Sequence, residues 1–304
     1  MVTRKSPLNA DVLIFLVTRL EENSQLTLKE LVQEVETKFN IETSESALNH
    51  ALEKMGISWK NVLPIPVDWN APSVIRARTT FIGSYLRFLE EDKLFYIDES
   101  GFNMHIFRSK GRASKGKPAT ITLVPKGKRV SLIAALSNSG ISHYELLNLI
   151  GEKKGTNAND FRLFILNLVK KIPFGSVLIL DNAKIHHATQ VQDLWDMIKK
   201  AYEIEVIYLP PYSPFLNPIE LAFNDIKIGV KSSQFYTKEE LIQIIHNQIS
   251  QITPQKAKNF FSHTKKFWNQ SLLGFPFKGT PLDPEIPNQS NTTLLLPPPQ
   301  NPSQ

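Results

Sequence analysis

The sequence predicts an α/β protein in which helices flank a mixed sheet, preceded by a small unit that is helical throughout. Residues 8–60 place apolar side chains three and four positions apart, the spacing typical of amphipathic helices. From residue 93 onward, short apolar runs typical of strands come first and then alternate with helical segments. This change in periodicity predicts two structural classes within one chain.

Three short helices are expected within residues 8–60. The second begins at Thr27, which is three residues before Glu30 and forms a capping-box pattern with it. The third runs from about Ser44 to Met55 and ends at Gly56. Three short helices are typical of a helix-turn-helix unit that binds DNA. Residues 1–60 nevertheless hold seven Lys/Arg and nine Asp/Glu, so a helical bundle without this role is the alternative.

The segment that follows is expected to connect two domains. Residues 61–75 contain three prolines and predict an extended linker, followed by a helix from about Ser73 to Glu91. We therefore predict a helix-turn-helix domain at 1–60, a linker and connecting helix at 61–92, and an α/β domain at 93–277. Residues 278–304 hold seven prolines and predict a disordered tail.

Composition excludes several classes of protein. Among 304 residues, 41% are hydrophobic and 21% charged, which is ordinary for a soluble globular protein, and no apolar run could span a bilayer. We expect no membrane partner. The absence of cysteine excludes disulfides, cysteine zinc sites and thiol nucleophiles, and fits an intracellular protein. The net charge of +6 favours a polyanionic partner, although many basic proteins bind no nucleic acid.

Three acids stand where the predicted elements begin or end. Asp98 and Asp181 each follow an apolar run, and Glu220 follows a proline-rich loop at the start of a predicted helix. Three converging carboxylates repel one another unless a cation neutralises them, and oxygen ligands favour Mg²⁺ or Mn²⁺. Any single acid at a strand end is more often an exposed turn residue, so the acids alone do not decide the function.

Four sequence motifs surround or lie between these acids. They are Ile97-Asp98-Glu99-Ser100-Gly101-Phe102, Gly111-Arg112-Ala113 with Gly116-Lys117-Pro118-Ala119, Leu180-Asp181-Asn182-Ala183 with His186, and Leu209-Pro210-Pro211-Tyr212-Ser213-Pro214-Phe215-Leu216-Asn217-Pro218-Ile219-Glu220. By these motifs the chain resembles the transposases of the Tc1/mariner and IS630 superfamily. The motifs occur in the family's order and span about residues 93–230, with a weaker likeness back to about residue 8.

The resemblance implies an RNase H-like fold whose catalytic and metal-binding residues are Asp98, Asp181 and Glu220. Two Mg²⁺ or Mn²⁺ ions are implied as cofactors. The implied reaction is cleavage of double-stranded DNA at the terminal inverted repeats of a mobile element, followed by attack of the 3′-hydroxyl on target DNA. A homodimer or higher assembly on DNA is also implied. The expected compartment is the nucleus in a eukaryotic host, and otherwise the cytoplasm with DNA.

Two features depart from the family's usual pattern. Related transposases commonly carry two helix-turn-helix units, whereas this chain has room for one before the catalytic domain. The family usually has a tryptophan shortly after the last acid, where this chain has Phe223. Glu99 beside Asp98 is a rival acid, but adjacent residues of a strand point to opposite faces, so only one of them enters the site.

A basic segment between the first two acids is the predicted DNA contact. Residues 105–130 hold eight Lys/Arg and no Asp/Glu, which favours a clamp on the DNA backbone over a solvated loop. Asn182 and His186 are expected either to contact the scissile phosphate or orient a ligand, or else to cap or pack the following helix. The basic residues are Arg108, Lys110, Arg112, Lys115, Lys117, Lys126, Lys128 and Arg129.

Three functions remain open at this level. The first is an active transposase, and the second is a catalytically silent DNA-binding protein derived from one. Retention of Asp98, Asp181 and Glu220 argues against the silent protein. The third is another RNase H-like nuclease that acts on RNA hybrids or DNA junctions, and the segment from Leu209 to Glu220 argues against it.

Overall fold

The computed structural model describes residues 8–86, 89–122, 129–147, 156–187, 189–277 and 279. Contacts divide the chain into two compact units, Met1–Ile65 and Pro66–Gln304. The first boundary therefore falls five residues after the predicted one. The predicted tail lies outside the described residues except for residue 279.

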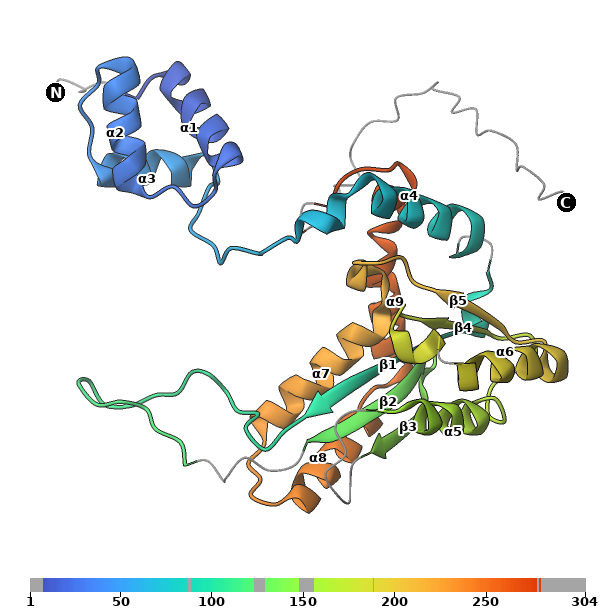
Figure 1. The fold of residues 1–304 in the computed structure, drawn as a ribbon. Coiled ribbons are helices and arrows are strands. Elements are labelled where there is room, and N and C mark those ends of the chain that lie inside the picture. Colours follow the sequence, from blue (N-terminus) through green and yellow to red (C-terminus); the bar gives the residue numbers. More distant parts are fainter. Residues whose placement is uncertain are drawn as a thin grey trace, which may run out of the picture. The chain divides into compact units, whose positions relative to one another are not determined.

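The first unit is a bundle of three helices around a small apolar core (Figure 1). Thr27 and Glu30 form the predicted capping box, and Arg19 makes two hydrogen bonds to Glu34 on the next helix, at 2.7 and 2.8 Å. The three predicted helices are thus confirmed. They are α1 (Ala10–Glu22), α2 (Leu28–Phe39) and α3 (Glu45–Lys54), and their buried residues are Val12, Leu16, Leu31, Val35, Leu48 and Leu52.

The second unit contains a five-stranded mixed sheet with the order β3-β2-β1-β4-β5. Its strands are β1 (Leu94–Phe102), β2 (Val130–Ser137), β3 (Gly140–Leu147), β4 (Val177–Leu180) and β5 (Glu205–Tyr208). The first three strands pair antiparallel, whereas β4 pairs parallel with both β1 and β5. This arrangement confirms the predicted α/β class.

The sequence prediction for the end of β1 was wrong. We expected Asp98 to stand at the end of a strand. Instead β1 continues to Phe102, because β2 pairs with it from Tyr96 as far as Phe102. Asp98 therefore lies inside a strand, and the chain leaves the sheet after Phe102.

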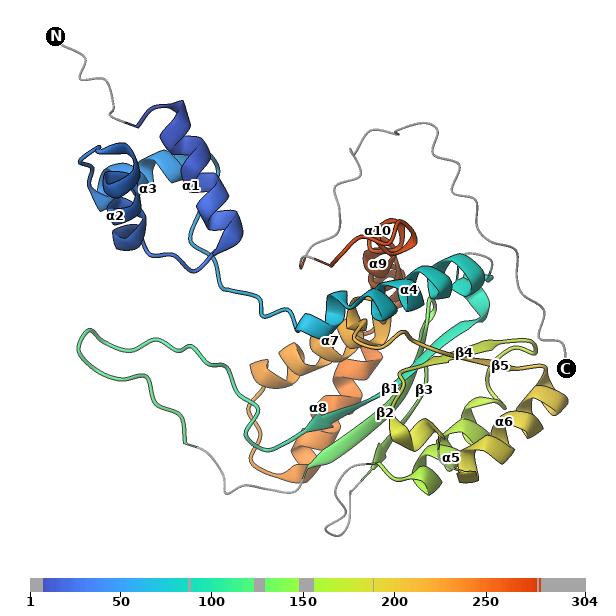
Figure 2. The ribbon, with the colours of Figure 1, turned by 45° about the horizontal axis from the view of Figure 1, so that its top comes forward.

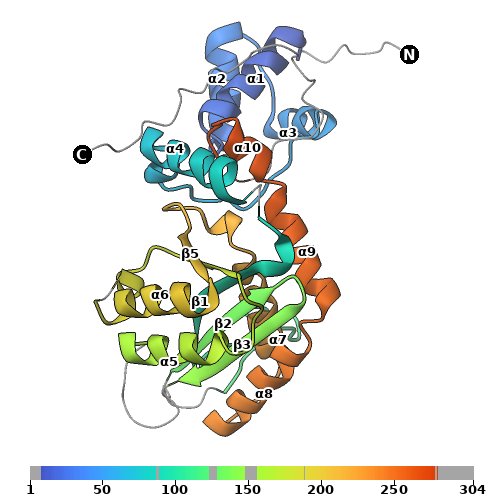
Figure 3. The same cartoon turned by 90° about the vertical axis from the view of Figure 1, so that its right-hand side faces the viewer.

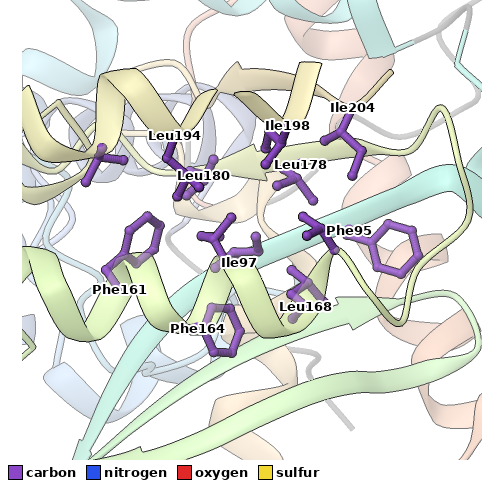
Figure 4. Close-up of a cluster of buried hydrophobic side chains, with 14 of the residues drawn as sticks. Phe95, Ile97, Phe161, Phe164, Leu168, Leu178, Leu180, Leu194, Ile198 and Ile204 are labelled. Atoms are coloured by element: carbon purple, nitrogen blue, oxygen red, sulfur yellow. The ribbon is translucent and has the colours of Figure 1, made fainter. Parts of the chain in front are cut away.

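Helices cover both faces of the sheet (Figure 3). The helices α5 (Ala158–Leu168) and α6 (Thr189–Tyr202) cover one face, and α7 (Pro218–Ser232), α8 (Lys238–Ser250) and α9 (Pro254–Lys265) lie on the other. Figure 4 shows the core beneath α5 and α6, where apolar side chains from these helices meet those of β1 and β4. Every residue of β4 is buried, as its continuous apolar run predicted. This core holds β1 and β4 rigidly side by side.

The segment before β1 is less helical than predicted. The helix α4 (Pro72–Thr80) ends early and continues as a π turn at Phe81–Tyr85, where Gly83 lowers helix propensity. A short 3₁₀ turn, Glu91–Lys93, then leads into β1. The short helix α10 (Trp268–Leu272) packs against α4, as Figure 2 shows.

The chain after β1 forms a long projection. Residues 103–122 extend away from the sheet in both Figure 1 and Figure 2 and contain much of the predicted basic segment. Within the described part of the chain, every helix is too short or too polar to traverse a bilayer.

Candidate active site

The three predicted catalytic acids line one cavity of about 440 Å³. Asp98, Asp181 and Glu220 share its wall with Asn217 and with residues 209–214, the proline-rich segment before α7. Residues that are 83 and 39 positions apart in the sequence are thus brought to a single place.

The sheet sets the position of the two aspartates. The last parallel pair between β1 and β4 joins Ile97 to Leu180, so Asp98 and Asp181 each come directly after it. On the other side of β1, Asp98 is paired with Ala134 of β2, so its backbone is part of a continuous strand. Asp181 instead follows the last residue of β4. One aspartate therefore has a rigid backbone, and the other stands where the strand becomes a loop.

Glu220 enters the cavity from the first turn of α7. Asn217 is the N-cap of this helix and Pro218 its first residue, a position at which the fixed torsion of proline suits a helix start. Before the helix, a 3₁₀ turn at Pro214–Leu216 ends with a hydrogen bond from the Asn217 backbone to Pro214. The fixed backbone torsions of these prolines help to set the angle at which Glu220 enters the cavity.

Burial and neighbouring negative charges strongly disfavour the ionised form of Asp98. Its side chain is 8% exposed, and burial together with the charges of Glu220 and Asp181 raises its pKa to about 8. One carboxylate oxygen accepts from the Glu99 backbone at 2.7 Å and the other from Asn217 Nδ2 at 3.2 Å. These bonds hold the group in place but do not offset its burial, so a positive charge in the cavity would favour its ionised form.

Glu220 is shifted in the same direction. Burial raises the pKa of Glu220, Lys227 opposes this shift, and Asp181 adds to it. Asp98 and Glu220 thus both have pKa values raised by burial and by the charge of Asp181, which is typical of a site that binds a cation.

The donor atoms of the cavity suit Mg²⁺ or Mn²⁺. All three acids offer hard oxygen ligands, and Asn217 Oδ1 is buried without a hydrogen-bond partner. Among the described residues, however, no three acidic or histidine side chains already converge in a geometry that would hold an ion. The chemistry therefore fits a divalent metal, although the side chains do not form a complete cage.

The neighbouring acid, Glu99, does not belong to the described wall of the cavity. Its Oε1 lies 3.4 Å from Nε2 of His186, whose Nδ1 lies 3.0 Å from Oδ1 of Asp181. Although burial alone would lower the pKa of His186, its hydrogen bonds to Asp181 and Glu99 raise it to about 10. The two carboxylates therefore favour the protonated imidazole in the metal-free protein.

The two other residues predicted near the phosphate have different surroundings. His186 is completely buried, which argues against direct DNA contact and leaves two expectations, that it orients a ligand or that it caps or packs the following helix. Asn182 is exposed and lines the cavity, so it has the access that contact with a phosphate requires. Its role stays a prediction.

The structure does not bring the described basic residues to the acidic cavity. Arg108 and Lys110 instead line a second cavity of about 630 Å³, which also includes Lys231 at the end of α7. Lys126 and Lys128 lie outside the described residues. The remaining members of the predicted set are exposed in the described chain: Arg112, Lys115, Lys117 and Arg129.

Sequence reasoning missed the role of Asn217 in the site. Its amide reaches Asp98 across 119 positions of sequence, which no local pattern reveals. The available signal was its place three residues before Glu220, where asparagine is a favoured N-cap. The N-cap side chain makes no capping bond here, because it turns to Asp98 instead.

Comparisons with known proteins agree with this geometry. Residues 93–242 match the family described as DDE superfamily endonuclease. The Mos1 mariner paired-end complex with Mn has a TM-score of 0.69 at 19% identity, covering 91% of this chain and 81% of that chain. The Mos1 strand transfer complex has a TM-score of 0.67 at 21% identity, and the match covers 87% of this chain and 78% of that chain. The catalytic domain of Mos1 mariner transposase has a TM-score of 0.51 at 16% identity, and the match covers 72% of this chain and 100% of that chain. None of the curated protein sequences matches the chain. These likenesses confirm the predicted RNase H-like fold.

Proposed function

We propose that this chain, whose residues 93–242 match the family described as DDE superfamily endonuclease, is a cut-and-paste DNA transposase. The observation that carries the proposal is the single cavity lined by Asp98, Asp181 and Glu220. Structures similar in fold include a Mos1 transposase paired-end complex with left transposon end and the Mos1 strand transfer complex. The reaction is cleavage of phosphodiester bonds at terminal inverted repeats, followed by transfer of the 3′-hydroxyl strand into target DNA.

The three acids act by holding divalent cations beside the scissile phosphate. When bound, two Mg²⁺ or Mn²⁺ ions would supply the charge that activates a water and stabilises the leaving oxygen. Mos1 complexes with Mn and with Mg support this choice of metal. The protein contributes position: Asn217 and the Glu99 backbone hold Asp98, and the start of α7 presents Glu220. We infer that no covalent enzyme intermediate forms, because positioning and electrostatics suffice for this displacement.

Double-stranded DNA is the proposed partner of both units. In the first unit, α1 to α3 have the size and caps of a helix-turn-helix module, and we assign element-end recognition to it. In the second unit, the basic residues from Arg108 to Arg129 are assigned to the DNA backbone, and Asn182 to the phosphate near the acids. A homodimer or higher assembly on DNA, and an intracellular location, complete the proposal.

The test is cleavage of DNA that carries the element's own ends, in the presence of Mg²⁺ or Mn²⁺. The intact chain is compared with Asp181→Ala and with Asp193→Ala, which removes an exposed aspartate from α6. Metal-dependent cuts that disappear only in Asp181→Ala would support the proposal. Binding of the ends without cleavage under either metal would favour a silent, transposase-derived DNA-binding protein. Preferential cleavage of RNA hybrids or junctions would favour a different nuclease.

A further inference from the structure

The side chain of His186 is absent from the described lining of the acidic cavity but contacts Asp181, which belongs to that lining. It belongs to the 3₁₀ turn Lys184–His187, five residues after Asp181. Its Nδ1 lies 3.0 Å from Oδ1 of Asp181 and 3.1 Å from the backbone oxygen of the same residue. Since both oxygens only accept, this ring nitrogen is the donor.

The other ring nitrogen contacts a second acid on a different strand. Nε2 of His186 lies 3.4 Å from Oε1 of Glu99. Glu99 follows Asp98 in β1, and alternation along the strand turns its side chain to the opposite face. The imidazole thus connects the end of β4 to the middle of β1, and both of its nitrogens are engaged by carboxylates. It has no nitrogen left to bind a metal in this arrangement.

Packing holds the imidazole in this orientation. The side chain is fully buried, and Phe161 of α5 lies against it with ring centroids 4.5 Å apart. The backbone oxygen of His186 accepts a hydrogen bond from the Tyr208 hydroxyl at 3.2 Å, and that hydroxyl accepts one from Trp195 at 3.1 Å. A buried ring with fixed neighbours holds its hydrogen-bond partners in one orientation more firmly than an exposed side chain would.

Asp181 is the acid that most needs such support. Its side chain is 45% exposed and follows the last residue of β4, whereas Asp98 is buried within a continuous strand. Oδ1 of Asp181 accepts from His186 and from the Ala183 backbone at 3.1 Å, which restricts rotation of the carboxylate. We propose that Glu99 and His186 are positioning residues that keep Asp181 oriented for metal binding. This inference rests on the proposed metal-dependent function.

Two substitutions at one position separate positioning from simple packing. In His186→Asn, the amide nitrogen replaces Nδ1, so the bond to Asp181 is retained and the link to Glu99 is lost. In His186→Gln, the amide nitrogen replaces Nε2, so the link to Glu99 is retained and the bond to Asp181 is lost. Both variants lose the ring and its contact with Phe161, which makes them matched for packing.

The measurement is Mn²⁺ affinity of the full chain without DNA, by electron paramagnetic resonance, with folding checked by circular dichroism. Loss of partners that orient a metal ligand typically costs about 10–100-fold in metal affinity. We expect His186→Gln to weaken Mn²⁺ binding by about this factor and His186→Asn to bind closer to the intact chain. Equal affinities of the two folded variants would overturn the inference, as would absence of Mn²⁺ binding by the intact chain.

Glu99→Gln gives a second test at a residue whose substitution leaves the core intact. It retains the size of the side chain but removes its charge, and we expect Mn²⁺ binding to weaken severalfold. Unchanged affinity in this variant would also refute the inference, even if both His186 variants failed to fold.

DNA cleavage separates this inference from the proposed function. If the intact chain cuts element ends while all three variants bind Mn²⁺ normally, the proposed function stands and this inference fails. If the variants bind Mn²⁺ more weakly but the intact chain never cuts DNA, this inference stands and the proposed function fails.

Discussion

Removing the charge of Asp98 is expected to stabilise the metal-free protein above about pH 5. The folded-state pKa of this carboxyl is raised from 3.8 to about 8, chiefly by burial and by Glu220. A raised pKa means that the folded state retains a proton that the unfolded chain releases. The stability contributed by this group is therefore complete below pH 3.8 and is lost progressively as the pH rises to about 8.

The size of the effect follows from the pKa shift. Each unit corresponds to about 1.4 kcal/mol, so the shift from 3.8 to about 8 sets an upper bound of roughly 5–6 kcal/mol. Relaxation of the site and coupling to the other acids will reduce this, and we expect Asp98→Asn to stabilise the chain by about 2–3 kcal/mol at pH 8. At pH 4 the two proteins should differ much less.

The assay is urea denaturation in EDTA at several pH values between 4 and 9. The free energy of unfolding of Asp98→Asn minus that of the intact chain should increase with pH and level off near pH 8. Asp193→Asn, at an exposed position of α6, is the control and should show no such trend. Parallel pH profiles for Asp98→Asn and the intact chain would refute the reasoning. Mn²⁺ should then stabilise the intact chain more than the variant, because only the former retains all three acids.

Three further predictions concern the site, the core and DNA binding. Asn217→Ala removes a buried donor and should destabilise the chain by about 1–3 kcal/mol in urea denaturation, with slower DNA cleavage. Leu178→Ala, in fully buried β4, should cost about 2–5 kcal/mol, whereas Leu163→Ala, at a side chain 58% exposed on α5, should change stability by less than about 0.5 kcal/mol. Replacing Arg108 and Lys110 by alanine should weaken DNA binding for all sequences and reduce the slope of log affinity against log salt by about 1 per lost phosphate contact. An unchanged slope would remove these two residues from the DNA interface.

Local patterns predicted local structure well. The capping box of Thr27 and Glu30 was visible in the sequence because both partners lie within one helical turn. The extent of β1 was not, because its last residues are held by pairing with β2, which follows a long insertion. Asp98 was therefore expected at the end of a strand, and it lies within one because of a non-local pairing.

In the candidate site too, local patterns were predicted and contacts between distant residues were not. The acids were identified from the motifs around them, and the sheet does bring them to one cavity. The contact between His186 and Glu99 could not be predicted, because the two residues are 87 positions apart and meet only through the pairing of β1 with β4. Asn182 is exposed and His186 is buried. This difference follows from where each residue lies relative to the cavity and not from its residue type.

The sheet topology explains why a strained acidic site persists in this chain. The parallel part of the sheet ends where Asp98 and Asp181 begin, and the antiparallel part continues β1 beyond that point. Asp98 comes directly after the last pair with β4 and is itself paired with Ala134 of β2, so its repulsion from Glu220 and Asp181 cannot be relieved by moving the strand. The apolar core under α5 and α6 stabilises this arrangement and offsets the repulsion. If that account is right, Asp98→Asn gains stability at the expense of metal binding, and Leu178→Ala loses stability without changing which ligands the cavity presents.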